Sequence, residues 1–361
     1  VALRVPDGYI CAHANKARIG EFPLDNPDNC LYSEDVIDFA IERGYYDPAS
    51  GEPFRFHEAY CPADQQKLRY TETRVWSMFR RAAPSREWPT DYHRGVEGAE
   101  PYPLWIKPDR KLARADVFGL MRDHYEGTDY DMTQGIDAGP FGTPNRWRPM
   151  TFNLDGTDYT WERPISTQQT GYSFVSQSRS WLPDPIGGLF WYGVDDTYFT
   201  CYVPFYCGAT EVPDCYAKGS LGEFSWDSTW WVTNFVANFA NLKYSYMKED
   251  IQKVQSELES SFALLQPAIE KTALEIYKTQ PELLAPYLSG YSTSQAEKVH
   301  KRYLELARLL IRKYNDGYVQ DERGRPQEVG YPDDWYREVI RARPDRFRIE
   351  SEDSLETDLP Y

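Results

Sequence analysis

Cysteine thiols and histidine imidazoles are the side chains of this sequence that most directly offer nucleophilic or metal-binding chemistry. The chain has five histidines and six cysteines: Cys11, Cys30, Cys61, Cys201, Cys207 and Cys215. No two cysteines form a C-x-x-C pair and the histidines are scattered, so we expect no metal site. Buried free thiols are the favoured interpretation. Disulfides in an oxidising compartment are the alternative, with Cys201, Cys207 and Cys215 the closest candidates.

Motifs with a defined catalytic mechanism are absent from the sequence. It contains no G-x-G-x-x-G, no Walker loop, no H-E-x-x-H and no G-x-S-x-G. We therefore expect no cofactor, and spacing alone indicates no more than an α+β domain.

Residues 165–206 are the stretch around which the chain is organised. Three runs rich in aromatic and β-branched residues, 172–177, 189–194 and 200–206, predict strands. Proline, glycine and aspartate separate them, as turns require. The second run, Leu-Phe-Trp-Tyr, does not alternate apolar with polar residues, which predicts a strand that is covered on both faces.

Composition limits the classes of partner. The chain has 361 residues and a net charge of −16, and an acidic chain is a poor ligand for nucleic acid. No 18-residue apolar run is present, so no membrane span is expected. Periplasmic, secreted and cytoplasmic locations all remain open, as does assembly into a homo-oligomer.

Helical spacing predicts most of the remaining elements. Helices are expected at 33–44, 71–83, 113–125, 244–265, 268–278, 294–313 and 333–341. Residues 54–60 are interpreted as a strand, and Pro267 is expected to kink or end its helix. We divide the chain into a main α+β portion at 1–266, a helical C-terminal extension at 267–348 and an acidic tail at 349–361.

A helix rich in aromatic residues is predicted after Asp227. The pattern recurs at spacings of one, three and four along Trp230, Trp231, Asn234, Phe235, Asn238 and Phe239. This period favours side chains in the core, and stacking on a ligand is the alternative.

Two long motif groups carry a family resemblance. The first is V-P-D-G-Y-I (5–10), A-H-A-N-K-A-R-I (12–19) and D-N-P-D-N (25–29). The second is G-V-D-D (193–196), C-Y-V-P-F-Y (201–206), A-N-F-A (237–240) and Y-S-Y-M (244–247). With R-V-W (74–76) and A-P-S (83–85), this order resembles the cysteine dipeptidase family of the N-terminal-nucleophile hydrolases, from the start of the chain to about residue 255.

The resemblance implies a mechanism and a fold. Such enzymes use a cysteine that is the first residue of the mature chain; its thiol attacks the scissile carbonyl and its α-amino group is the general base. The implied fold is a four-layer αββα sandwich, which agrees with a strand covered on both faces, and the implied substrate is a dipeptide or short peptide. The sequence departs from the family at its first residue, Val1. We therefore expect the nucleophile and the first strands in an upstream part of the same protein, and this chain alone to be inactive.

Two residues are the candidate catalytic groups that the resemblance implies. Asn15, in A-N-K-A-R-I, corresponds to an asparagine that donates to the oxyanion, and an Asn that caps a turn is the alternative. Arg179, in Ser178-Arg179-Ser180, corresponds to an arginine near the nucleophile, and an ion-paired structural arginine is the alternative. His13 and Arg18 are weaker candidates. Cys201 is expected to be buried in a strand.

Two other functional classes remain open. One is a non-catalytic domain that binds peptide or glycan, and the other is a structural domain that has lost activity.

Overall fold

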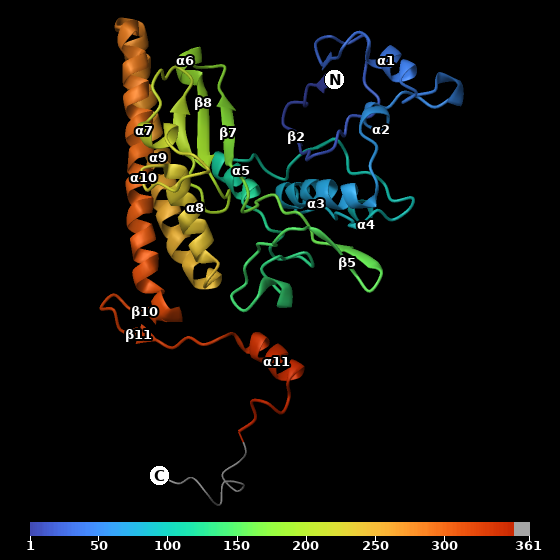
Figure 1. Cartoon of the computed structure of the whole chain (residues 1–361). Coiled ribbons are helices and arrows are strands. Elements are labelled where there is room, and N and C mark those ends of the chain that lie inside the picture. The colour runs from blue at the N-terminus through green and yellow to red at the C-terminus, as the bar shows by residue number, and fades with distance from the viewer. Residues whose placement is uncertain (350–361) are drawn as a thin grey trace, which may run out of the picture. The chain divides into compact units, whose positions relative to one another are not determined.

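The computed structural model describes residues 1–349 and combines helices with short antiparallel strands, which confirms the α+β class. The chain forms two compact units (Figure 1). The first is Val1–Tyr130 with Arg146–Thr167, and the second is Asp131–Asn145 with the chain from Gln168 onward. The predicted acidic tail, from residue 350 on, lies outside the described residues. Between residues 1 and 349 no helix combines the length and apolar character of a membrane span.

The first unit has one long helix and several short elements. Its helices are α1 (Val36–Glu42), α2 (Phe56–Tyr60), α3 (Gln65–Ala82), α4 (Asp91–Arg94) and α5 (Arg114–Met121), with a 3₁₀ turn η1 (Pro48–Ser50). Its strands are β1 (Ala2–Leu3), β2 (Ile10–Cys11), β3 (Cys30–Leu31), β4 (Trp105–Ile106), β5 (Thr151–Leu154) and β6 (Thr157–Thr160). They pair antiparallel as β1–β3, β2–β4 and β5–β6.

Helix α3 is the centre of the first unit. The Asp64 carboxylate accepts the Lys67 amide at 2.7 Å and caps the helix, since the first N–H groups lack intrahelical partners. Val75, Trp76 and Phe79 are buried. The helix ends at Ala82 shortly before Pro84, as the sequence predicts.

The second unit holds the sheet and the long helices. Its strands are β7 (Tyr172–Ser178), β8 (Gly188–Val194), β9 (Val203–Tyr206), β10 (Val319–Gln320) and β11 (Pro326–Gln327). Its helices are α6 (Asp184–Gly187), α7 (Asp214–Ala217), α8 (Thr229–Ala240), α9 (Tyr244–Thr279), α10 (Leu284–Lys313) and α11 (Asp333–Ala342). The 3₁₀ turns are η2 (Ile136–Ala138), η3 (Pro281–Leu283) and η4 (Asn315–Gly317).

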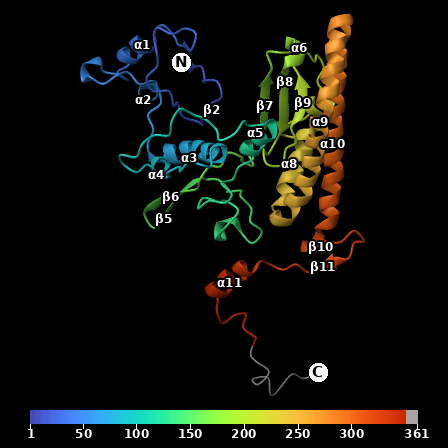
Figure 2. The same ribbon diagram turned by 180° about the vertical axis from the view of Figure 1, so that it is seen from behind.

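Strands β7, β8 and β9 form an antiparallel sheet in that order, within two or three residues of the predicted strands. Trp191 of β8 stands opposite Val175 of β7 and Pro204 of β9. Leu189 and Trp191 are buried on one face, and helices α8, α9 and α10 pack beside the sheet (Figure 2).

The opposite face of this sheet is only half covered. Tyr172 and Phe174 are 59% and 45% exposed, and they pair with Tyr192 and Phe190 at ring-centroid distances of 5.8 and 4.4 Å. The prediction that the central strand is covered on both faces is therefore wrong for the described part of this chain. The apolar run instead places one row of side chains in the core and one in an aromatic row at the surface.

Helix α9 continues through Pro267, so the alternative in which this proline ends the helix is wrong, and the alternative of a kink stays a prediction. Proline removes one N–H, and the carbonyl four residues earlier, at Ala263, is then left without its donor. Ala263 is exposed, so water can satisfy that carbonyl. The predicted division at 266/267 falls inside this helix, and the functional assignment of the portions on either side stays a prediction.

The aromatic helix α8 buries a different face from the predicted one. Val232, Val236, Ala237 and Ala240 are buried, whereas its indole and phenyl side chains are only half buried. Small residues on the inner face allow close packing against α10, and the larger rings lie along the flank.

Residues 54–60 were predicted as a strand but contain helix α2. Short aromatic runs fit either a strand or a helix. Here hydrogen bonds to other segments of the chain accompany the helical conformation. The amides of Phe56 and His57 donate to Gly20 and Ile19, and the Tyr60 hydroxyl donates to Val36 at 2.5 Å.

Candidate functional site

Asn15 lies on an exposed loop of the first unit and is held by helix α3. Arg74 donates from Nη2 to Asn15 Oδ1 at 2.8 Å, and its Nε donates to the Tyr70 carbonyl at 2.8 Å. A guanidinium is a donor only, so this contact fixes the oxygen end of the amide on Arg74. No acceptor for Asn15 Nδ2 lies at hydrogen-bond distance in residues 1–349. The amide nitrogen is thus the end available to a ligand.

The charge state of Arg74 is secure near neutral pH. Burial lowers the pKa of Arg74 to about 10, with Tyr125 raising it and Arg163 lowering it. A group with that pKa stays protonated at pH 7, so the donor to Asn15 is retained.

A buried cluster of charged residues, Lys16, Arg18 and Glu72, holds the same loop against α3. Glu72 of α3 is fully buried, with Arg18 Nε at 3.2 Å and Lys16 Nζ at 3.7 Å. Arg18 also donates to the carbonyls of Ala12 and Tyr102 at 2.7 and 2.8 Å. The contacts of Arg18 tie the loop to α3. His13, the other weaker candidate, is exposed, and its Nδ1 lies 3.2 Å from the neighbouring Ala14 carbonyl.

Arg179 lies at the end of β7 in the second unit and is buried among structural partners. Its Nε donates to Gly187 O at 3.2 Å, its Nη2 donates to Ile186 O at 2.7 Å, and its Nη1 pairs with Glu270 of α9. These contacts are those of an ion-paired structural arginine, and a role beside a nucleophile stays a prediction. Asn15 and Arg179 belong to different compact units, and each site is described within its own unit.

Among the thiols, the structure distinguishes buried from activated groups. Cys30 and Cys201 are buried, as expected for Cys201, although Cys201 precedes β9 and does not lie within a strand as predicted. Burial acts to raise the pKa of the half-exposed Cys61, but the Ala17 backbone and the Lys67 ammonium outweigh it and lower that pKa. Burial raises the pKa of Cys215. Cys61 is therefore the thiol with a thiolate-favouring environment, which sequence spacing did not indicate.

Asp195 is a further candidate that the sequence analysis treated only as a turn residue. It follows β8 with φ of 64°, a left-handed conformation that is uncommon outside glycine. Its side chain is buried, Oδ1 accepts from Asn234 Nδ2 at 2.9 Å, and Oδ2 has no hydrogen-bond partner among the described residues. Burial raises the pKa of Asp195 to about 7, while the Asp196 amide and Asn234 oppose this. In the sequence, the feature that could have indicated this candidate is the pair Asp195-Asp196 directly after an apolar run.

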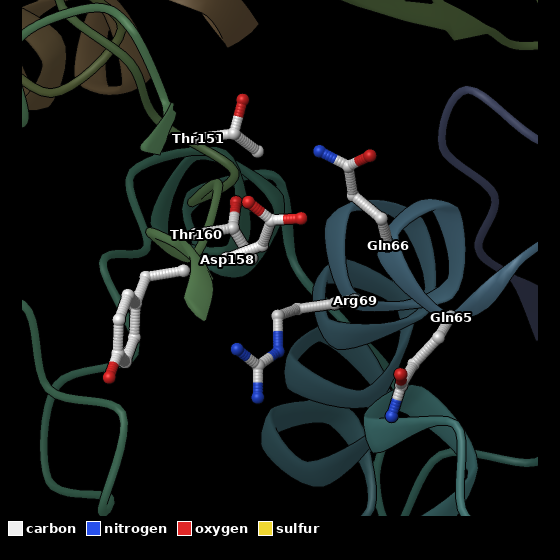
Figure 3. A pocket seen from close by; sticks show the side chains of 7 residues that line it. Gln65, Gln66, Arg69, Thr151, Asp158 and Thr160 are labelled. Carbon is white, nitrogen blue, oxygen red and sulfur yellow. The ribbon is translucent and has the colours of Figure 1, made fainter. Parts of the chain in front are cut away.

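Two cavities lie in the first unit. One, of about 260 Å³, is lined by apolar side chains such as Leu3, Val5 and Trp105 together with the loop at 11–13 and 16–19. The other, of about 560 Å³, lies between the first turns of α3 and the β5–β6 hairpin (Figure 3). Its polar lining consists of Gln65, Gln66, Arg69, Thr151, Asp158 and Thr160.

The model of one protein family, Peptidase family C69, matches residues 1–257. The chain belongs to peptidase family C69. The motifs at 5–29 and 193–247 lie within the matched range, so family membership confirms that the resemblance is to a family of peptidases.

Curated relatives have names that agree with the family. A probable dipeptidase of Salmonella dublin is 28% identical over 222 residues, which cover 62% of this chain and 45% of the relative. A probable dipeptidase of Latilactobacillus sakei is 26% identical over 76% of this chain and 53% of the relative. Probable dipeptidase A of Streptococcus pyogenes serotype M3 is 25% identical over 83% and 60%. The chain thus spans about half the length of the curated relatives it matches.

Proposed function

We propose that this chain is the distal portion of a cysteine-nucleophile dipeptidase that hydrolyses dipeptides or short peptides through an acyl-enzyme. The match to peptidase family C69 over residues 1–257 carries this proposal. The relatives named as dipeptidases support the choice of dipeptides as the substrate class.

In this proposal Asn15 stabilises the oxyanion. Thiolate attack forms a bond between sulfur and the carbonyl carbon and places negative charge on the carbonyl oxygen. An amide N–H aimed at that oxygen lowers the barrier, because its hydrogen bond to the oxygen strengthens as the negative charge develops. Arg74 supports this role by holding Asn15 Oδ1, which leaves Nδ2 to donate.

The nucleophile is proposed to be an N-terminal cysteine upstream of Val1. Its α-amino group takes the thiol proton and returns it to the leaving amine as the C–N bond breaks. Water then attacks the thioester carbon, and the carboxylic acid product and the thiol are released. Within this chain, Cys61 is the alternative nucleophile, because its surroundings lower the pKa of its thiol.

The four-layer αββα arrangement remains part of the proposal. The aromatic row of Tyr172, Phe174, Phe190 and Tyr192 supports it, because stacked sheets pack through such side chains at about 10 Å separation. Strands supplied by the upstream part would occupy this face.

The proposed function is tested by comparing this chain with the full-length gene product. Both are incubated with Ala-Ala and a panel of dipeptides, and released amino acids are quantified. We expect steady turnover only from the longer protein, and its loss after iodoacetamide treatment. Steady dipeptide cleavage by the purified 361-residue chain would contradict an upstream nucleophile.

A non-catalytic peptide- or glycan-binding domain is the second candidate. The exposed aromatic rings just before α8 favour it, since Trp226 and Phe224 are 44% and 46% exposed and Trp226 packs on Phe235 of α8 at a ring-centroid distance of 5.1 Å. Saturable binding without turnover in the full-length protein would favour this function over hydrolysis.

A further inference from the structure

The cavity between α3 and the β5–β6 hairpin carries two opposite charges that do not neutralise each other. Arg69 is half buried and forms no ion pair or side-chain hydrogen bond in the described range 1–349. Asp158 Oδ1 accepts from Asn153 Nδ2 at 2.7 Å, and no cation lies within 4 Å of its carboxylate in the same range. Figure 3 shows Arg69 reaching from the helix and Asp158 extending from the hairpin.

Neutral hydrogen-bonding groups occupy the rest of the lining. Gln65 Nε2 is held by the Arg94 carbonyl at 3.0 Å, which leaves its amide oxygen as an acceptor. The Tyr70 hydroxyl and Thr160 Oγ1 lie 2.6 Å apart and link the helix to the hairpin, so the two walls are joined. The lining thus combines neutral amide and hydroxyl groups with a cation and an anion, neither of which has an ion-pair partner among residues 1–349.

We propose that this cavity binds a short peptide or free amino acid in its zwitterionic form. The ligand carboxylate pairs with the Arg69 guanidinium, whose fork matches a carboxylate in two hydrogen bonds, and the ammonium pairs with Asp158. A ligand that carries both charges satisfies both walls at once, whereas a simple anion or cation leaves one charge unpaired. The volume of about 560 Å³ accommodates a dipeptide.

The cavity is connected to the Asn15 loop through one row of α3. Gln66, Tyr70 and Arg74 follow each other at intervals of four, so they share a helix face. Gln66 Nε2 lies 3.5 Å from the Tyr70 hydroxyl, and Arg74 holds Asn15. This inference goes beyond the proposed hydrolysis and requires no nucleophile, so binding to the 361-residue chain tests it separately.

Isothermal titration calorimetry of this chain with Ala-Ala, alanine, N-acetyl-Ala-Ala and Ala-Ala-amide measures what each ligand charge contributes to binding. N-acetylation removes the ammonium of the ligand, and amidation removes its carboxylate. We expect Ala-Ala to bind and each blocked dipeptide to bind about tenfold more weakly, since a charge-assisted hydrogen bond contributes about that factor. Mass spectrometry after titration verifies that Ala-Ala is intact. Comparison with alanine assigns the site to the peptide or to the free amino acid. Blocked dipeptides that bind as tightly as Ala-Ala overturn the proposal.

Variants locate the binding. Arg69→Gln and Asp158→Asn should each raise the Kd for Ala-Ala about tenfold, whereas the exposed controls Arg86→Gln and Asp155→Asn should leave it unchanged. Wild-type affinity in both charge variants, with unchanged circular dichroism, would place the ligand elsewhere and refute the assignment.

Discussion

Arg74 and Asn15 are joined by a hydrogen bond of 2.8 Å from Nη2 to Oδ1, across fifty-nine positions of sequence. The bond has a chemical consequence that neither residue has alone. Because the guanidinium can only donate, it consumes the amide oxygen and leaves the amide nitrogen as the free end. An exposed asparagine is thereby converted from a flexible turn residue into an oriented donor.

The first prediction concerns this donor. In the full-length protein, Asn15→Ala should lower kcat by 10²–10³-fold with a much smaller change in KM, since loss of one oxyanion donor costs about 3 kcal/mol. Steady-state kinetics with Ala-Ala measure both constants. Asn29→Ala, an exposed asparagine of the same unit, is the matched control. Near-normal kcat in a folded Asn15→Ala protein removes Asn15 from the site.

Arg179 is predicted to contribute to stability through its buried pair with Glu270. Arg179→Met leaves the Glu270 carboxylate without its cation, and breaking a buried pair costs about 3 kcal/mol or more. Urea unfolding of the chain measures this loss. The double variant Arg179→Met with Glu270→Gln should recover part of the loss because the uncompensated charge is gone. A single variant as stable as wild type would refute the structural role.

A catalytic role for Arg179 has a separate readout. If the guanidinium also stabilises the upstream thiolate, activity should fall from wild type to Arg179→Lys to Arg179→Met, and the thiol pKa should rise in the Met variant. The pH dependence of iodoacetamide alkylation of the N-terminal cysteine in the full-length protein measures that pKa. Coinciding profiles in folded variants leave Arg179 with its structural role alone.

The sequence predicted the sheet better than it predicted what covers the sheet. Residues 172–177 and 189–194 became β7 and β8 because turn residues separate aromatic and β-branched runs. Which face of the sheet is covered depends on helices that lie far away in the sequence, as Phe190 and Tyr192 illustrate. They belong to the same apolar run as Trp191, yet only Trp191 faces the helices.

The site was predicted one residue at a time, without its partners. Asn15 was proposed from its motif, but its hydrogen bond with Arg74 could not be predicted because pairing across loops has no local pattern. Arg69 and Asp158 were missed for the same reason: a lone arginine on a helix and a lone aspartate on a hairpin are ordinary until the fold places them around one cavity. Asp195 was interpreted as a turn residue, and only burial makes its carboxyl unusual.

The cysteines of this chain are predicted to be dispensable for the chemical step. In the full-length protein, replacing Cys201, Cys207 and Cys215 together by Ala or Ser should lower stability by roughly 1 kcal/mol or more for a buried thiol such as Cys201, with turnover retained. Cys61→Ser should likewise retain turnover, although surroundings lower the pKa of this thiol. Kinetics and thermal melting are measured together. A folded variant without turnover would place the nucleophile within this chain.

Asp195 makes the stability of the chain depend on pH in a defined direction. Its folded-state pKa of about 7 exceeds the ordinary value of 3.8, so the native state holds a proton that the unfolded state has lost between these values. The contribution of Asp195 is therefore fully present below about pH 4 and is lost as pH rises to about 7, a loss on the order of 4 kcal/mol. Other groups titrate too, so the comparison must be with a variant that is neutral at this position.

Asp195→Asn is the variant that isolates this effect. Asparagine tolerates the left-handed backbone and carries no charge at any pH, so its stability relative to wild type should rise between pH 4 and pH 7 and then level off. Urea midpoints of both proteins at pH 4.5, 6 and 8 measure the difference. Asp155→Asn is the matched control, because Asp155 also has a positive φ, of 52°, but is exposed, and its difference should stay flat. A difference between Asp195→Asn and wild type that is the same at all three pH values would show that the Asp195 carboxyl titrates alike in the folded and unfolded states, contrary to the effect of its burial.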